Sequence, residues 1–231
     1  MAGESQFDHY ADDYDAALAR GLSVSGEGRD FFASGRLAFL GRCLRERQLT
    51  VESVLDFGCG TGASVPLIQG AIGARIITGV DESRRSIAAA AQAHGGPGVT
   101  FSLTAEHAPA ANFDLVYTNG VFHHIPVAER PAALSFIRDV LKPGGLFSFW
   151  ENNPWSLGAR YVMSKIPFDR DAVMVSARQA RDLARQHGFR VLRTDYLFIF
   201  PAALKILRPL EELARRAPLG AQYQVLCAKA A

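Results

Sequence analysis

Residues 54–65 read VLDFGCGTGASV, a short apolar run followed by a turn rich in glycine. A turn of this kind after a strand brings backbone N–H groups close to a ligand, usually the pyrophosphate of a dinucleotide. Here the spacing is Gly58-x-Gly60-x-Gly62 rather than G-x-G-x-x-G, and Asp56 stands two residues before the first glycine. Because a carboxylate repels a pyrophosphate at close range, the loop predicts a ligand that carries positive charge and no phosphate.

A second acidic residue narrows the choice of ligand. Asp81 ends the apolar segment ARIITGVD, 19 residues after Gly62, where an acid commonly accepts hydrogen bonds from both hydroxyls of a ribose. S-adenosylmethionine combines a nucleoside with a zwitterionic amino acid tail and has no phosphate. The two acids and the glycine spacing therefore favour this cofactor over a nicotinamide dinucleotide, and so disfavour a nicotinamide-dependent oxidoreductase.

Four motifs follow one another along the chain: VLDFGCGTG (54–62), GVDES (79–83), FDLVYTNGVFHHIP (113–126) and LKPGGLFSF (141–149). In this order they resemble the motifs of class I S-adenosylmethionine-dependent methyltransferases, particularly the small-molecule branch that includes the ubiquinone and menaquinone biosynthesis enzymes. A fifth segment, FDHYADDYD near the start, resembles the N-terminal cap of the family. The resemblance covers roughly residues 7–150.

Short β-branched or aromatic runs alternate with helix-like segments, which indicates an α/β fold with a parallel sheet covered on both faces. The family resemblance implies a Rossmann-like, seven-stranded sheet of order 3-2-1-4-5-7-6 with the last strand antiparallel. We expect one domain over residues 1–231, with a helical cap (1–48), a cofactor-binding half (49–150) and a substrate half (151–231). Two long connections, 151–175 and 201–220, are predicted to be cap insertions at the ligand-binding edge of the sheet.

The resemblance also assigns cofactor contacts. Asp56 and the three glycines match the loop that holds the methionine moiety, and Asp81 matches the ribose acid. After the third strand the family usually has Asp-Ala-Glu, whose first acid contacts the adenine amino group, whereas this chain has Thr104, Ala105 and Glu106. The expected cofactor-binding residues are Tyr10, Tyr14, Asp56, Gly58, Gly60, Gly62, Asp81, Thr104, Ala105, Glu106 and Asn119, and no metal is expected. The two tyrosines have an alternative interpretation as aromatic residues that pack a helix on the core.

His123 and His124 follow the predicted fourth strand, where the family places residues beside the transferred methyl group. An imidazole there can take a proton from an alcohol, phenol or amine nucleophile, because it titrates near neutral pH. One histidine could instead hold the loop, and methyl transfer can also proceed by positioning alone, without a dedicated base. Both histidines are candidates for catalysis, and the sequence does not choose between them.

The segment ENNPW (151–155) supplies candidate acceptor contacts at the end of the fifth strand. Its Asn-Pro-Trp is similar to the signature of nucleic-acid amino methyltransferases, but that signature follows the fourth strand, so we do not expect a nucleobase acceptor. In the second insertion, leucines recur at helical spacing among basic residues, which is typical of core packing with a solvated basic face. The alternative is a lid that rests on a membrane through residues 201–216 or admits a lipid-linked or phosphorylated acceptor. The predicted substrate-binding residues are Glu151, Asn152, Trp155 and Arg208.

Composition indicates a cytoplasmic, globular protein. The 231 residues carry 25 Lys+Arg and 23 Asp+Glu, and a net charge of +2 gives no general attraction for nucleic acid. The three cysteines lack the paired spacing of a zinc site or a disulfide framework, the acidic N-terminus does not resemble a signal peptide, and no apolar run is long enough to span a bilayer.

We expect a monomer or homodimer that transfers a methyl group from S-adenosylmethionine to a small molecule, with S-adenosylhomocysteine as product. Oxygen is the favoured methylated atom, and nitrogen and carbon stay open. The alternative is a non-catalytic, cofactor-binding regulatory or assembly protein.

Overall fold

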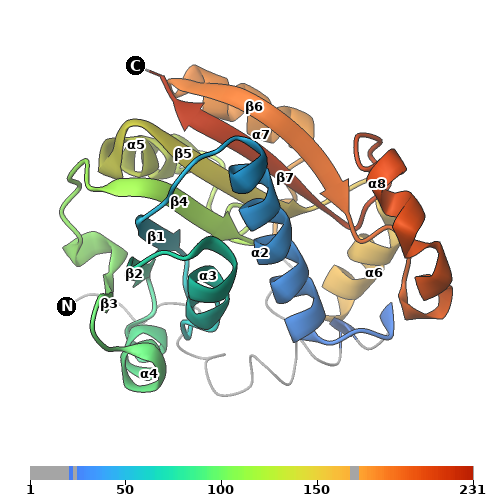
Figure 1. The fold of residues 1–231 in the computed structure, drawn as a ribbon, viewed down its shortest axis with the longest axis horizontal. Coiled ribbons are helices and arrows are strands. Elements are labelled where there is room, and N and C mark those ends of the chain that lie inside the picture. The colour runs from blue at the N-terminus through green and yellow to red at the C-terminus, as the bar shows by residue number, and fades with distance from the viewer. Residues whose placement is uncertain (1–20, 23–24, 167–171, 231) are drawn as a thin grey trace.

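The structure is a computed structural model that describes residues 21–22, 25–166 and 172–230. Its centre is a seven-stranded sheet of order β3-β2-β1-β4-β5-β7-β6, in which β7 runs antiparallel to both of its neighbours (Figure 1). This confirms the order and the antiparallel last strand expected from the sequence. The strands are β1 (Ser53–Phe57), β2 (Ile76–Asp81), β3 (Val99–Leu103), β4 (Phe113–Asn119), β5 (Leu141–Asn152), β6 (Phe189–Leu197) and β7 (Gln222–Lys229).

Helices cover both faces of the sheet, as Figure 1 shows. On one face α2 (Arg29–Glu46) and α3 (Val65–Ile72) pack on a core that contains Trp150, and on the other α5 (Arg130–Val140) and α7 (Ala177–Gln186) pack on a core that contains Phe147. The central strand β1 is buried along its whole length, which explains why the adjacent residues Val54 and Leu55 are both apolar and do not alternate with exposed polar residues. The helix α4 (Arg84–His94) connects β2 to β3.

The helix boundaries follow from local chemistry. The side chain of Ser83 accepts a hydrogen bond from the backbone N–H of Ser86 at the start of α4. Ser176 and Gln179 form a capping box at the start of α7, with each side chain bonding the backbone of the other residue. Such caps satisfy N–H groups that have no partner inside the helix. They fix where each helix begins.

The two insertions lie at the end of the sheet where β5 finishes and β7 begins. The first contains α6 (Leu157–Lys165), and the second contains the 3₁₀ helix η5 (Ala202–Leu210) and the short helix α8 (Glu211–Ala214). Figure 1 shows both insertions on the same side of the molecule. Within the described ranges, no helix has the length and apolar character needed to cross a bilayer.

The leucine pattern of the second insertion does not represent core packing. Leu204 is 46% exposed, Leu210 51% and Leu213 84%. Pro209 lies inside η5 and has no N–H to donate, so the segment does not form the regular α-helix that its spacing suggested. Spacing alone cannot tell a covered apolar stripe from an uncovered one. The interpretation of this stripe as part of the core is therefore wrong.

Candidate functional site

The loop between β1 and α3 has left-handed backbone conformation at each of its three glycines, with φ of 76° at Gly58, 53° at Gly60 and 78° at Gly62. A side chain at Gly58 would collide with Val121, which follows β4. At Gly60, in contrast, no atom of the described residues lies within 4 Å of the position that a side chain would occupy. The first glycine therefore lets two loops pack together, and the second keeps the described part of the chain away from a position where a ligand could approach the loop.

Asp81 ends β2 and holds this loop in place. One carboxylate oxygen accepts a hydrogen bond from the N–H of Gly60 at 2.9 Å, and the other accepts from the N–H of Ser83 at 2.9 Å. A carboxylate oxygen accepts more than one hydrogen bond, so these contacts leave acceptor capacity for hydroxyl groups of a ligand. The structure thus places Asp81 against the glycine loop, as expected of a residue that contacts the same ligand.

Asp56 lies beneath the loop in β1 and is 2% exposed. Its Oδ2 is a buried acceptor without a hydrogen-bond partner among the described residues. Burial and the nearby negative charge of Asp81 raise the pKa of Asp56 to about 7, although a hydrogen bond from Ser64 and the positive charge of Arg36 act in the opposite direction. Buried polar atoms in folded proteins normally have partners, so a bound donor would satisfy this one.

Arg36 of α2 is a site residue that the sequence analysis missed. It is 7% exposed, donates from Nε to the Tyr117 hydroxyl at 3.2 Å and donates from Nη1 to Gln222 at 2.9 Å. Tyr117 is the register partner of Asp56 on the adjacent strand, which brings the guanidinium group to the Asp56 side of the sheet. The sequence places Arg36 one turn from Leu40 and two turns from Leu44, so it is a lone charge on an apolar helix face. This pattern could have identified Arg36 as a candidate site residue.

His123 and Glu151 form a buried pair at the ends of β4 and β5. The Nδ1 atom of His123 lies 2.6 Å from Oε2 of Glu151, and the backbone N–H of His123 donates to Oε1 at 3.3 Å. The two side chains are only 3% and 1% exposed. A carboxylate at Nδ1 holds the proton on that nitrogen and leaves Nε2 able to accept another. The expected direct contact between Glu151 and the acceptor thus has an alternative, in which Glu151 orients His123.

Arg36 and His123 border a cavity of about 440 Å³ between helix α2, the insertion helix α6 and the segment before η5. Four residues predicted from the sequence line it, and further lining comes from apolar side chains of the surrounding elements. The volume is in the range of small-molecule binding sites. The four predicted residues are Asn119, His123, His124 and Asn152, and the apolar lining includes Phe31, Phe32, Val162, Met163, Phe198 and Phe200.

Other predicted residues lie away from this cavity. Trp155 is 75% exposed and does not line it. Arg208 is in η5, where it forms an ion pair with Glu27 at 2.7 Å. In the short helix η3 (Thr104–Glu106), the Glu106 carboxylate pairs with Arg84 at 3.1 Å on the surface, and Thr104 and Ala105 precede it. Tyr10 and Tyr14 lie outside the described residues.

Comparison with known sequences gives the following matches. Residues 54–145 match the family model described as a methyltransferase domain. A ubiquinone biosynthesis O-methyltransferase of Cereibacter sphaeroides (strain ATCC 17029) is 38% identical over an alignment of 127 residues, and the match covers 49% of this chain and 49% of the relative. A trans-aconitate 2-methyltransferase of Agrobacterium fabrum is 34% identical over 104 residues, 44% of this chain and 40% of the relative. The chain thus spans about half the length, or less, of these two relatives.

Solved structures share the fold over a longer span. A structure that contains the Haloferax volcanii Trm112 methyltransferase activator and a methyltransferase matches with a TM-score of 0.67 and 18% identity, over all of both chains. An S-adenosylmethionine-dependent methyltransferase of Thermotoga maritima matches with a TM-score of 0.64 and 22% identity, over 96% of this chain and 97% of the other. These similarities establish a shared fold and say nothing about the acceptor.

Proposed function

This chain carries a class I S-adenosylmethionine-dependent methyltransferase domain, and from that premise we propose that it binds S-adenosylmethionine at the glycine loop and transfers the methyl group to a small molecule. The observation that carries the proposal is the buried Oδ2 of Asp56, which has no hydrogen-bond partner among the described residues, in the strand that leads into the glycine loop. An ammonium group is a donor that matches a buried carboxylate in both charge and hydrogen bonding.

The described residues fit each part of the cofactor. Asp56 and Arg36 offer one negative and one positive charge on the same side of the sheet, which suits the ammonium and carboxylate of the methionine tail. Asp81 would accept from the ribose hydroxyls while it holds Gly60. We assign the adenine end to the β3–η3 turn at Thr104 and Ala105, because the Glu106 carboxylate is paired with Arg84. Asn119 would contact the cofactor from the end of β4, beside the acceptor cavity.

The Asp81→Ala variant tests this assignment. We expect S-adenosylhomocysteine to bind the parent protein, with no comparable affinity for NAD. The variant should bind it more weakly by about 1 to 3 kcal/mol, because the ribose hydroxyls lose a charged acceptor. Isothermal titration calorimetry measures both values. Tight binding of NAD without any response to S-adenosylhomocysteine would refute the cofactor assignment.

The reaction that we propose is transfer to an oxygen nucleophile held in the 440 Å³ cavity. The cofactor would supply a methyl group on a sulfonium, whose S–CH3 bond breaks to leave the neutral thioether of S-adenosylhomocysteine. His123 would take the proton of the acceptor hydroxyl at Nε2 as the new C–O bond forms, and Glu151 would stabilise the imidazolium through Nδ1. Asn152 lines the same cavity, while its Oδ1 accepts a hydrogen bond from Gln222 at 3.1 Å. We infer that it helps to orient the acceptor.

A non-catalytic role is the alternative to this proposal. A regulatory or assembly protein would bind the cofactor without turnover, and nothing in the glycine loop distinguishes the two roles. The buried His123–Glu151 pair favours an enzyme, because it prepares a base at a cavity of substrate size. Incubation with tritiated S-adenosylmethionine and cell extract separates the possibilities. Label in an extractable compound indicates an enzyme, whereas binding without any label transfer indicates the alternative.

We also propose a hydrophobic or lipid-linked acceptor that reaches the cavity from a membrane surface. Exposed apolar side chains gather on the two insertions that border the cavity, and we call this set the apolar rim. Basic side chains, including Arg160 of α6 and Lys205 of η5, are exposed on the same elements and would favour an anionic lipid surface. Arg208, Arg215 and Arg216 contribute less, since each pairs with an acid of this chain. The apolar rim consists of Trp155, Leu157, Tyr161, Ile206, Leu210 and Leu213.

The double variant Ile206→Glu with Leu213→Glu tests the membrane contact. These side chains are 85% and 84% exposed, so the fold should tolerate the changes. Binding to phosphatidylglycerol vesicles should fall roughly tenfold, because two apolar contacts are lost and two like charges are added. Vesicle co-sedimentation measures this, with Val127→Glu as control, since Val127 is 61% exposed outside the apolar rim. Equal binding by the parent and the double variant, or none by the parent, would count against the membrane contact.

The three cysteines are free and buried. Burial raises the pKa of Cys43 to about 11 and that of Cys227 to about 12, so neither thiol is poised for oxidation. We propose on this basis that the protein works in a reducing compartment such as the cytoplasm.

A further inference from the structure

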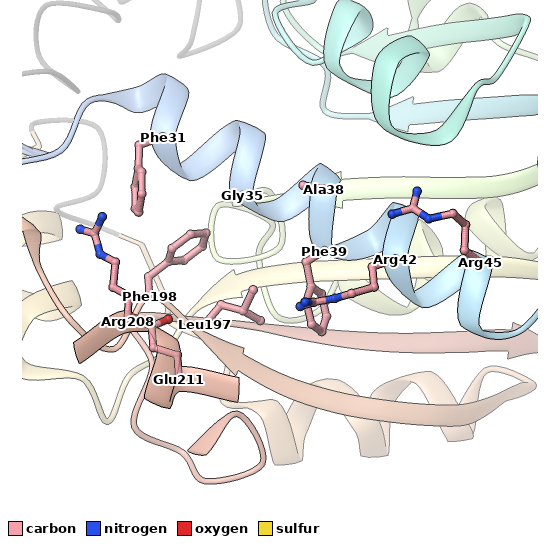
Figure 2. A pocket seen from close by; sticks show the side chains of 10 residues that line it. All are labelled: Phe31, Gly35, Ala38, Phe39, Arg42, Arg45, Leu197, Phe198, Arg208 and Glu211. Carbon is pink, nitrogen blue, oxygen red and sulfur yellow. The ribbon is translucent and has the colours of Figure 1, made fainter. Parts of the chain in front are cut away.

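A second hollow lies between α2, the end of β6 and the η5–α8 segment. It has a volume of about 390 Å³, and we call it the outer groove (Figure 2). Its apolar lining includes Phe31 and Phe39 of α2 together with Leu197 and Phe198 after β6. Of the described residues that line it, only Arg208 was predicted above to bind substrate, and Phe31 and Phe198 also line the acceptor cavity. The outer groove is therefore a neighbour of the acceptor cavity, with Phe198 between the two.

The wall between the outer groove and the acceptor cavity contains a residue with an unfavourable backbone conformation. Phe198, which lines both hollows, has a left-handed backbone with φ of 63°. Its ring packs so closely on α2 that a Cβ at Gly35 would lie 2.7 Å from a ring carbon. A glycine inside a helix and an aromatic residue at positive φ are each unfavourable, and such features concentrate at functional sites.

Aromatic contacts hold this wall in place. The ring centroid of Phe198 lies 5.0 Å from that of Phe32 and 5.8 Å from that of Phe31, both in the first turn of α2. Figure 2 shows Phe31 and Phe198 on the side of the outer groove where Arg208 also lies. The guanidinium carbon of Arg208 is 4.5 Å from the centre of the Phe31 ring. The apolar lining is thus a preformed surface next to a fixed positive charge.

The rim of the outer groove is predominantly basic. Arg42, Arg45 and Arg208 line it, against one acid, Glu211. The Glu211 carboxylate already accepts a hydrogen bond from the N–H of Phe200 at 2.9 Å. Arg208 pairs with Glu27, and Arg42 has a longer contact of 3.4 Å with the half-exposed Glu212. Arg45 has no ion-pair partner in the described part of the chain, so its charge is available to a ligand.

We propose that the outer groove binds a small apolar anion, that is, an aromatic or alkyl group bearing a carboxylate, sulfonate or phosphate. The apolar part would lie on Phe31, Leu197 and Phe198, and the anionic group would contact Arg42 and Arg45. Arginine suits all three anions because its planar N–H donors match their oxygens. The source of such a ligand is either the far end of the methyl acceptor or a separate metabolite. The binding site itself does not depend on the proposed methyl transfer.

The probe for this site is 8-anilinonaphthalene-1-sulfonate, an aromatic sulfonate whose fluorescence rises in apolar surroundings. The double variant Arg42→Gln with Arg45→Gln should bind the probe roughly tenfold more weakly, because the sulfonate loses two charged donors. Ala38→Trp, on the exposed side of α2, should weaken binding by at least as much by filling the outer groove. Fluorescence titration gives each dissociation constant. The neutral analogue N-phenyl-1-naphthylamine should respond to Ala38→Trp and not to the loss of the two arginines.

The matched control is Arg47→Gln, which removes an exposed arginine that does not line the outer groove and should leave probe affinity unchanged. Calorimetry with S-adenosylhomocysteine on every variant shows that the cofactor site is intact, which separates this test from that of the proposed function. Unchanged probe affinity in both the double variant and Ala38→Trp would refute the proposal. So would a parent protein that does not bind the probe, or an equal loss in Arg47→Gln. If the probe competes with the acceptor identified by labelled-methyl transfer, the acceptor is the source of the anion. If both bind together, the source is a separate metabolite.

Discussion

His123→Asn is expected to lower the rate of methyl transfer by roughly 10²-fold or more, while the affinity for S-adenosylhomocysteine stays nearly unchanged. The amide nitrogen of asparagine can replace Nδ1 as a donor to Glu151, but nothing replaces Nε2. The substitution therefore removes the proton acceptor and keeps Glu151 hydrogen-bonded. This matters because a buried carboxylate that loses its partner destabilises a fold by several kcal/mol. The measurement is single-turnover transfer to the acceptor identified with labelled cofactor.

The Glu151→Gln variant separates two effects of Glu151: the orientation of His123 and the stabilisation of its imidazolium. The amide oxygen of the glutamine still accepts a hydrogen bond from Nδ1 of His123. The imidazolium that forms during transfer, however, loses the negative charge of Glu151, whose Oε2 lies 2.6 Å from Nδ1 in the parent protein. We expect a loss of about tenfold, and the acidic limb of the pH–rate profile should move to lower pH. A residue that only supports the fold would leave the profile where it is. His124→Asn tests the other candidate base, since His124 lines the same cavity one residue later. A large loss of rate in His124→Asn alone would assign the base to His124, and near-normal rates in all three variants would mean that transfer depends on positioning alone.

The sequence predicted the sheet well because buried parallel strands leave a direct pattern. Val54 and Leu55 of β1 have no exposed surface, and runs of such residues recur in each central strand. The glycine loop could also be recognised, since its spacing and Asp56 are local features. The strand order came from the family resemblance and was then confirmed by the observed pairing.

Contacts between distant residues were not predictable in the same way. Arg36 meets Tyr117, which is 81 residues away, and Glu151 meets His123 across 28 residues. Both contacts depend on which strands are neighbours, and a single sequence records this only indirectly. With the strand order known, Glu151 and His123 could have been paired, because Asn119 and Trp150 are register partners and each precedes one of them closely. The exposure of the leucines in the second insertion depends on which other segments cover them. The spacing of residues along the sequence does not indicate this.

Binding of S-adenosylhomocysteine is expected to strengthen by about tenfold between about pH 6 and pH 7.5, if Asp56 receives the ammonium of the methionine tail. In the ligand-free protein the pKa of Asp56 is raised to about 7, chiefly by burial and secondly by Asp81. The protonated acid is a poor partner for an ammonium, so affinity should rise as this proton is lost. The effect of rising pH on the stability of the ligand-free protein has the opposite sign to its effect on affinity. The folded, ligand-free protein keeps a proton that the unfolded chain releases, so the contribution of Asp56 to the free energy of unfolding should fall as pH rises from about 4 to about 7.

Asp56→Asn isolates this effect. The amide keeps the size of the side chain but removes its charge and its titration. Affinity for S-adenosylhomocysteine above pH 7 should fall by roughly 10²-fold, near the upper end of the range for a charged hydrogen bond, and the dependence on pH should flatten. Calorimetry at several pH values measures both changes, with the half-exposed Asp139→Asn as control. In chemical denaturation, the variant should lack the decrease in stability that the parent shows between about pH 4 and pH 7. An Asp56→Asn protein that binds as tightly as the parent, with the same pH dependence, would place the ammonium elsewhere and leave the buried Oδ2 of Asp56 without its proposed partner.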